Sequence, residues 1–310
     1  MERPPKISTK ERVSGEEDGE KKYGHDVTIH NYWIRHSQKA SGEISNATKT
    51  GASTSNISEG GALRAQERGK TFSASANGAK GYRSPSARTT ETFEALMRGY
   101  AQTNPAAPIR EAVNLREELA IPEGTKAFKA EYDAKWDANK KRLLAEGVGA
   151  GRYPDVEFGK LTPDQQEEIA EAAEEPVIRE WIDNPESELA KNFPPRLQAA
   201  HFSVLFNRRH ERMAKKLYNN SEIDLFHNTH KTATEAFLAS GVLIRKLDGQ
   251  RITKLKEIGG SLLVLDQWES IIKTDENGNV ITVVKIRGEE FDLDRDIYQQ
   301  LVTEGLEARK

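Results

Sequence analysis

The alternation of apolar and polar positions divides the start of the chain into three parts. Residues 1–26 mix Lys and Glu with Gly and Ser and have no apolar period, which predicts a disordered arm. Residues 27–34 are β-branched and aromatic, as is typical of a strand, and residues 40–58 are rich in small polar residues, as is typical of a loop. We therefore expect the folded part to begin with a strand near residue 27.

A helical pattern follows this loop. It runs from Glu59 to about Ala76, and Ser58 is placed to cap its start. A short extended piece at 79–83 and a second helical pattern at about 87–100 come next. The order strand, helix, strand, helix is the alternation expected of an α/β sheet.

The middle of the chain departs from this alternation. Residues 122–200 carry acidic and Ala-rich helical runs interrupted by prolines, which predicts a helical insertion lying over the carboxyl edge of the sheet. A long amphipathic helix is expected at about 195–218, followed by a strand at 223–228 and a helix at 231–239.

The last segment favours a β-hairpin and a final helix. Residues 262–265 and 280–286 are strand-like, Asn277-Gly278 between them is a strong hairpin signal, and a terminal helix is expected at about 294–309. The sequence thus predicts a three-layer α/β/α fold with a mostly parallel, doubly wound sheet. Residues 27–310 would form one domain, with the insertion at 122–200 and the hairpin and helix at 260–310 packed beside the core.

Composition narrows the class of protein. The 310 residues carry 46 basic and 49 acidic side chains, a net charge of −3, which argues against a globally basic nucleic-acid binder. The absence of cysteine excludes disulfides, thiolate metal sites and a Cys nucleophile. With no apolar run of about 20 residues and no secretory signal at the start, we expect a soluble, cytoplasmic protein without a membrane partner.

Four short stretches carry the candidate chemistry. Because residues just past the carboxyl ends of parallel strands converge in one crevice, these stretches are expected to meet. Two Arg, two His and a carboxylate in one crevice suit a phosphoryl group, since the Arg fork binds its oxygens and a helix N-terminus adds donors. The stretches are Arg35-His36-Ser37, Ser84 to Thr92 with Arg88, Leu115-Arg116-Glu117-Glu118, and Thr229-His230.

These stretches resemble, in order, the motifs of the histidine phosphatase superfamily, which has the phosphoglycerate-mutase-like fold. Arg35-His36 is similar to its opening Arg-His-Gly, and Ser84, Arg88 and Thr92 are similar to its Ser-x-x-x-Arg-x-x-x-Thr. Further matches are Ile57-Ser58-Glu59-Gly60-Gly61 with Gln66, Leu115-Arg116-Glu117, and Thr229-His230. Together the matches cover about residues 27–120 and 220–245.

The resemblance implies a phosphomonoester hydrolase that needs no metal or other cofactor and acts on a phosphorylated small molecule or protein. His36 would be the nucleophile that forms a phosphohistidine, and Arg35, Arg88 and His230 would bind the phosphoryl oxygens. Glu117 is the candidate proton donor, with Glu118 in reserve.

Two residues depart from the family pattern. Ser37 replaces the usual Gly after the nucleophile, and Lys231 replaces the usual small residue after the second His. Lys231 would either supply another cation for phosphate or point to solvent. These departures keep open a non-catalytic module that binds phosphorylated ligands, beside a phosphomutase of the same fold.

Three other patterns are interpreted as structural. On a strand, the offset of three between His227 and His230 puts the two side chains on opposite faces, which argues against a shared metal and favours a structural His227. A dinucleotide loop would have to follow a strand, whereas the glycine-rich run at 147–151 follows a predicted helix. The acidic run at 292–296 lacks the Gly and the Glu of a calcium loop.

Overall fold

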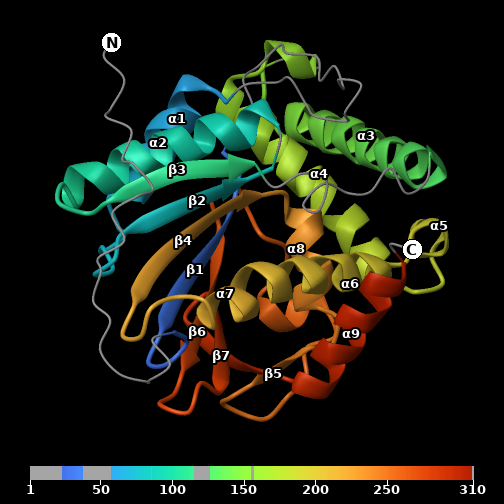
Figure 1. The fold of residues 1–310 in the computed structure, drawn as a ribbon. Coiled ribbons are helices and arrows are strands. Elements are labelled where there is room, and N and C mark those ends of the chain that lie inside the picture. Colours follow the sequence, from blue (N-terminus) through green and yellow to red (C-terminus); the bar gives the residue numbers. More distant parts are fainter. Residues whose placement is uncertain (1–22, 38–56, 85, 115–125, 155–156, 309–310) are drawn as a thin grey trace, which may run out of the picture.

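A mixed β-sheet lies between two layers of helices (Figure 1). The computed structural model describes residues 23–37, 57–84, 86–114, 126–154 and 157–308. Within these residues the sheet has eight strands in the order β3-β2-β4-β1-β6-β7-β8-β5. The strands are β1 (Thr28–Arg35), β2 (Ala79–Arg83), β3 (Ile109–Asn114), β4 (Glu222–Thr229), β5 (Leu243–Arg245), β6 (Gln267–Thr274), β7 (Val280–Ile286) and β8 (Glu289–Leu293).

The helices follow the expected order along the chain. They are α1 (Glu59–Gly69), α2 (Ala87–Thr103), α3 (Lys126–Gly149), α4 (Pro163–Asp183), α5 (Glu188–Asn192), α6 (Pro195–Phe206), α7 (Arg212–Ala214), α8 (Lys231–Leu238) and α9 (Arg295–Glu307). The helix expected at 195–218 is interrupted, because a π-helical segment at Asn207–Glu211 separates α6 from α7. No helix in the described part of the chain is both long and apolar enough to cross a membrane.

The α/β class expected from the sequence is confirmed, and the sheet itself is mixed. Strands β1, β2, β3 and β4 are parallel to one another, whereas β6 runs antiparallel beside β1, and β7, β8 and β5 continue antiparallel. The predicted hairpin therefore extends the sheet instead of packing beside it. Its first strand begins at Gln267 and not at Leu262, since Leu265 has a positive φ of 59°, which an extended strand cannot contain.

Alternating side chains of β1 fill the core on both faces of the sheet. Ile29 and Trp33 are buried in a large cluster with Phe202 of α6 and Phe237 of α8. Ile34, on the opposite face, is buried in a second cluster under α2. This period of two fixes which residues of β1 face each helical layer, and the chain past Arg35 leaves at the carboxyl end of the strand.

Helices α1 and α2 pack backbone to backbone through two glycines. A Cβ on Gly69 would lie 1.9 Å from the carbonyl oxygen of Leu96, and a Cβ on Gly99 would lie 1.8 Å from that of Gln66. Only a residue without a side chain permits this approach. The close contact fixes α2, which carries Arg88 in its first turn.

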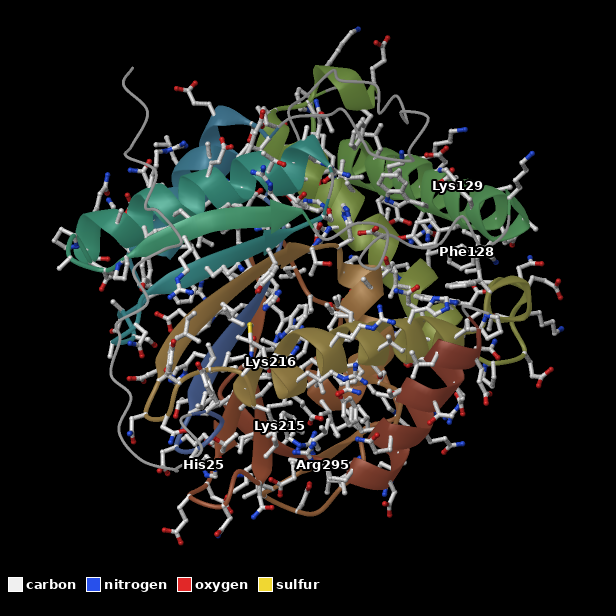
Figure 2. The ribbon with its side chains drawn as sticks, viewed as in Figure 1. His25, Phe128, Lys129, Lys215, Lys216 and Arg295 are labelled. Carbon is white, nitrogen blue, oxygen red and sulfur yellow. The ribbon has the colours of Figure 1, made fainter. Side chains whose placement is uncertain are left out.

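The insertion has a small core of its own. Phe128 of α3 packs against Trp181 of α4 and Phe193, with ring centroids 5.4 and 5.5 Å apart, while the adjacent Lys129 is exposed (Figure 2). The indole nitrogen of Trp136 donates to the carbonyl of Ala170, which ties α3 to α4. Helix α4 thereby lies beside the carboxyl ends of the parallel strands (Figure 1).

Candidate active site

Three parallel strands bring the sequence motifs together at their carboxyl ends. Strand β4 lies between β1 and β2, and in register Arg35 of β1 stands opposite Thr229 of β4. Just beyond the strands, the amide of His36 donates to the carbonyl of Thr229 at 3.1 Å. The amide of Ser84 donates to the carbonyl of Asn228, also at 3.1 Å. Segments that are about 50 and 200 residues apart in sequence thus meet as the strand-end argument predicts.

His36 is buried, and its tautomer is fixed by its own loop. Its Nδ1 lies 3.0 Å from the carbonyl oxygen of Ser37, and since a carbonyl only accepts, Nδ1 carries the proton. The Nε2 atom therefore keeps its lone pair. Burial, followed by the charge of Arg88 and contributions from His230 and Arg35, holds the pKa of His36 well below its usual value.

His230 lies beside His36, with ring centroids 5.0 Å apart and the rings nearly perpendicular. It stands at the N-cap position of α8, and its Nε2 is 3.2 Å from the hydroxyl of Ser84. Burial and the charges of Arg88 and Arg35 lower the pKa of His230 to about 3. Both imidazoles are therefore neutral at physiological pH.

Arg88 is the cation that α2 contributes. It is the second residue of the helix, and Ser86 caps the helix by accepting from the amide of Thr89. Its Nε is buried and has no hydrogen-bond partner among the described residues. A buried N–H group without an acceptor is uncommon, and it is the kind of donor that an anion would satisfy.

Ser37 hydrogen-bonds through both its side chain and its amide. Its hydroxyl donates to the carbonyl of Gly61 at 2.7 Å, and its amide donates to the hydroxyl of Thr92 at 2.9 Å. The extra side chain thus ties the His36 loop to α1, and Thr92 of the Ser84–Thr92 motif ties it to α2.

The sequence did not predict the partners of Arg35. Its Nη1 donates to Glu171 at 2.6 Å and to the carbonyl of Leu262 at 2.9 Å. Its Nη2 pairs with Glu171 at 2.5 Å and with Glu174 at 3.4 Å. These contacts account for its four terminal N–H groups, and the buried Nε is left without a described partner. An acidic run was visible in the sequence, but spacing along a helix does not reveal which distant cation it meets.

Of the two roles expected for Lys231, the one at solvent is wrong, and a role as a further cation for phosphate stays a prediction. It is buried, and its Nζ pairs with Glu174 at 2.7 Å, so it does not point to solvent. The same carboxylate accepts from the hydroxyl of Tyr132 at 2.7 Å. Burial would raise the pKa of Glu174, but Lys231 and Arg35 lower it to about 2, so the carboxylate is charged.

The remaining candidates are placed as follows. Glu117 and Glu118 lie outside the described residues, so the identity of the proton donor stays a prediction. His227 is buried between the rings of Trp33 and Tyr82, at centroid distances of 4.0 and 5.0 Å, as a structural residue would be. Within the described residues, no group of three or more His, Asp or Glu side chains could hold a metal ion.

Similarity to known proteins is found at the level of structure. No protein-family model matches the sequence, and no curated protein is significantly similar to it. The phosphoglycerate mutase of Bacillus anthracis str. Sterne shares 15% identity over 91% of this chain and 99% of that chain, with a TM-score of 0.38. The phytase from D. castellii shares 14% identity over 89% and 79% of the two chains, with a TM-score of 0.47.

A third solved structure is Hafnia alvei phytase in complex with myo-inositol hexakis sulphate. It shares 12% identity over 86% of this chain and 85% of that chain, with a TM-score of 0.42. At 12–15% sequence identity, these likenesses concern the fold.

Proposed function

We propose that the protein hydrolyses phosphomonoesters through a phosphohistidine formed on His36. One observation carries the proposal: His36 is buried and neutral, its Nδ1 proton is held by the Ser37 carbonyl, and its Nε2 lone pair is available beside His230 and Arg88. A neutral imidazole with a fixed tautomer is a competent nucleophile toward phosphorus.

In the first step the Nε2 atom of His36 attacks phosphorus while the bond from phosphorus to the ester oxygen breaks. The non-bridging oxygens would accept hydrogen bonds from Arg88, His230 and the Nε of Arg35. In phosphoryl transfer, such positioning and electrostatic stabilisation provide most of the rate acceleration. The leaving oxygen takes a proton from an acid, for which Glu117 is the candidate. In the second step water attacks phosphorus, its proton passes to the same carboxylate, and phosphate and free His36 are released.

The site is tested by hydrolysis of a chromogenic aryl phosphate. We expect His36→Ala to lower kcat by at least about 1,000-fold, since it removes the nucleophile. The matched control is His25→Ala, because His25 lies near the other end of the sheet and hydrogen-bonds to the backbone of Glu276 (Figure 2). Equal hydrolysis by wild type and His36→Ala would remove His36 from the mechanism.

The scheme uses no metal ion. We therefore expect EDTA to leave hydrolysis of the aryl phosphate unchanged after dialysis, as measured by kcat/KM. A loss of activity that added divalent cation restores would contradict this part of the proposal.

Two alternatives would use the same residues. A phosphomutase would transfer the phosphoryl group from His36 to an alcohol instead of water, which migration of phosphate on a sugar phosphate would reveal. A module that binds phosphorylated ligands without turnover would bind inorganic phosphate and release none from any ester.

A further inference from the structure

Helix α4 of the insertion presents a stripe of carboxylates to the site. Three glutamates at spacings of four and three residues lie on one face of the helix. Each pairs with a cation from a different element of the core, namely α1, β1 and α8. The pairs are Glu167 with Arg64 at 3.1 Å, Glu171 with Arg35 at 2.5 Å, and Glu174 with Lys231 at 2.7 Å.

Two of these pairs lie inside the candidate active site and are largely shielded from water. The side chains of Arg35 and Lys231 are 8% and 3% exposed, and those of Glu171 and Glu174 are 15% and 20% exposed. Salt screens charges weakly at such sites. Because each carboxylate directly contacts its cation, their opposite charges largely cancel. In the described part of the site, Arg88 is the one cation that has no ion pair.

In the part of the site that the structure describes, the surplus positive charge is therefore small. A single phosphoryl group can be met by Arg88, by the two imidazoles and by the unused Nε of Arg35. A second phosphoryl group close to the first finds its potential cations already bound, and it faces the carboxylates of α4. At an effective dielectric constant of about 20, such repulsion weakens binding by on the order of tenfold per added group.

We propose that Glu171 and Glu174 determine the substrate class, restricting the site to monoesters that carry one phosphoryl group and no second anionic group near the ester. Multiply phosphorylated compounds are poor substrates. This inference rests on the proposed function for the reacting group, and it assigns the insertion a role in specificity that the catalytic motifs do not contain.

The test compares kcat/KM for an aryl monophosphate, fructose 1,6-bisphosphate and myo-inositol hexakisphosphate. We expect the wild type to prefer the aryl monophosphate. The variant Glu174→Gln keeps the hydrogen-bonding shape but frees the charge of Lys231, so the ratio of kcat/KM for hexakisphosphate over monophosphate rises about tenfold. The control Glu180→Gln removes the same charge from α4 at a residue that pairs with Lys135 of α3, outside the site, and leaves the ratio unchanged.

Two results would overturn the inference. They are a wild-type preference for the hexakisphosphate and an unchanged ratio in Glu174→Gln, which includes an equal rise or fall of kcat/KM on all three substrates. An equal rise would mean that the stripe is a general brake, and an equal fall would mean that it only docks the insertion. If Glu174→Gln does not give the wild-type thermal unfolding transition, Glu171→Gln carries the same expectation.

Binding separates this inference from the proposed function. Calorimetric titration of His36→Ala with inorganic phosphate and with myo-inositol hexakisphosphate measures the same ratio without turnover. A tenfold shift on adding Glu174→Gln supports the inference even if no ester is hydrolysed. Turnover through His36 with an unshifted binding ratio leaves the proposed function intact and overturns the inference.

Discussion

Burial of His230 beside two guanidinium groups makes the stability of the protein depend on pH. The folded state holds the pKa of His230 at about 3, whereas an imidazole in the unfolded chain has a pKa of about 6.5. At pH values between these two pKa values, His230 is protonated in the unfolded state and neutral in the folded state. Stability contributed by this group is therefore complete above pH 6.5 and falls as the pH is lowered.

The size of the effect follows from the shift. Between pH 8 and pH 5, stability falls mainly over the roughly 1.5 pH units that lie below the unfolded pKa of about 6.5. At about 1.4 kcal/mol per pH unit, the free energy of unfolding decreases by about 2 kcal/mol because of His230. The lowered pKa of His36 acts in the same direction. Replacing His230 by Gln removes the part of this pH-dependent stability loss that His230 causes, and it leaves the other titrating groups in place.

Urea unfolding at pH 8 and pH 5 measures this difference. We expect His230→Gln to lose about 2 kcal/mol less stability than the wild type between the two pH values. His30→Gln is a control of opposite sign. A hydrogen bond to Glu269 outweighs burial and raises the pKa of His30, so this residue stabilises the wild type at low pH and its variant loses more. An identical loss in wild type and His230→Gln would refute the reasoning.

Three substitutions test the packing around the site, each by urea unfolding. Ser37→Ala removes the hydrogen bond to Gly61 and should cost about 1 kcal/mol, and no change would show that this bond contributes nothing. Thr92→Val leaves the buried amide of Ser37 without its acceptor and should cost about 1–3 kcal/mol, with a fall in kcat for the aryl phosphate; unchanged stability and kcat would contradict this. Gly81→Ala places a Cβ 1.9 Å from the ring of Phe93 and should cost about 1–3 kcal/mol, whereas wild-type stability would mean that the ring moves freely.

Local signals allowed much of the fold to be predicted. The β-branched run before Arg35 and the cap at Ser58 act within a few residues, and the structure has both. The meeting of His36, Ser84 and His230 was also predictable, since it needs only that three strands be parallel and adjacent. The order of the motifs along the chain supplied the resemblance from which the roles of these residues were predicted.

Pairings between distant residues were not accessible in this way. The hairpin joins the sheet because β6 pairs with β1, where Trp33 stands opposite Trp268, and no local pattern specifies that edge. The pairs of Arg35 with Glu171 and Glu174 join residues more than 130 positions apart. A helix period shows that two carboxylates share a face, and only tertiary packing shows which cation that face meets.

The most direct test of the mechanism is the location of the phosphoryl group on the enzyme. The protein is mixed with an aryl phosphate, quenched in alkali within milliseconds, and studied by ³¹P NMR and by peptide mass spectrometry. Because the Ser37 carbonyl holds the Nδ1 proton, the account predicts an acid-labile phosphoryl group on Nε2 of His36, absent from His36→Ala. Turnover with the phosphoryl group on Nδ1, on another residue, or on no residue at all would contradict it.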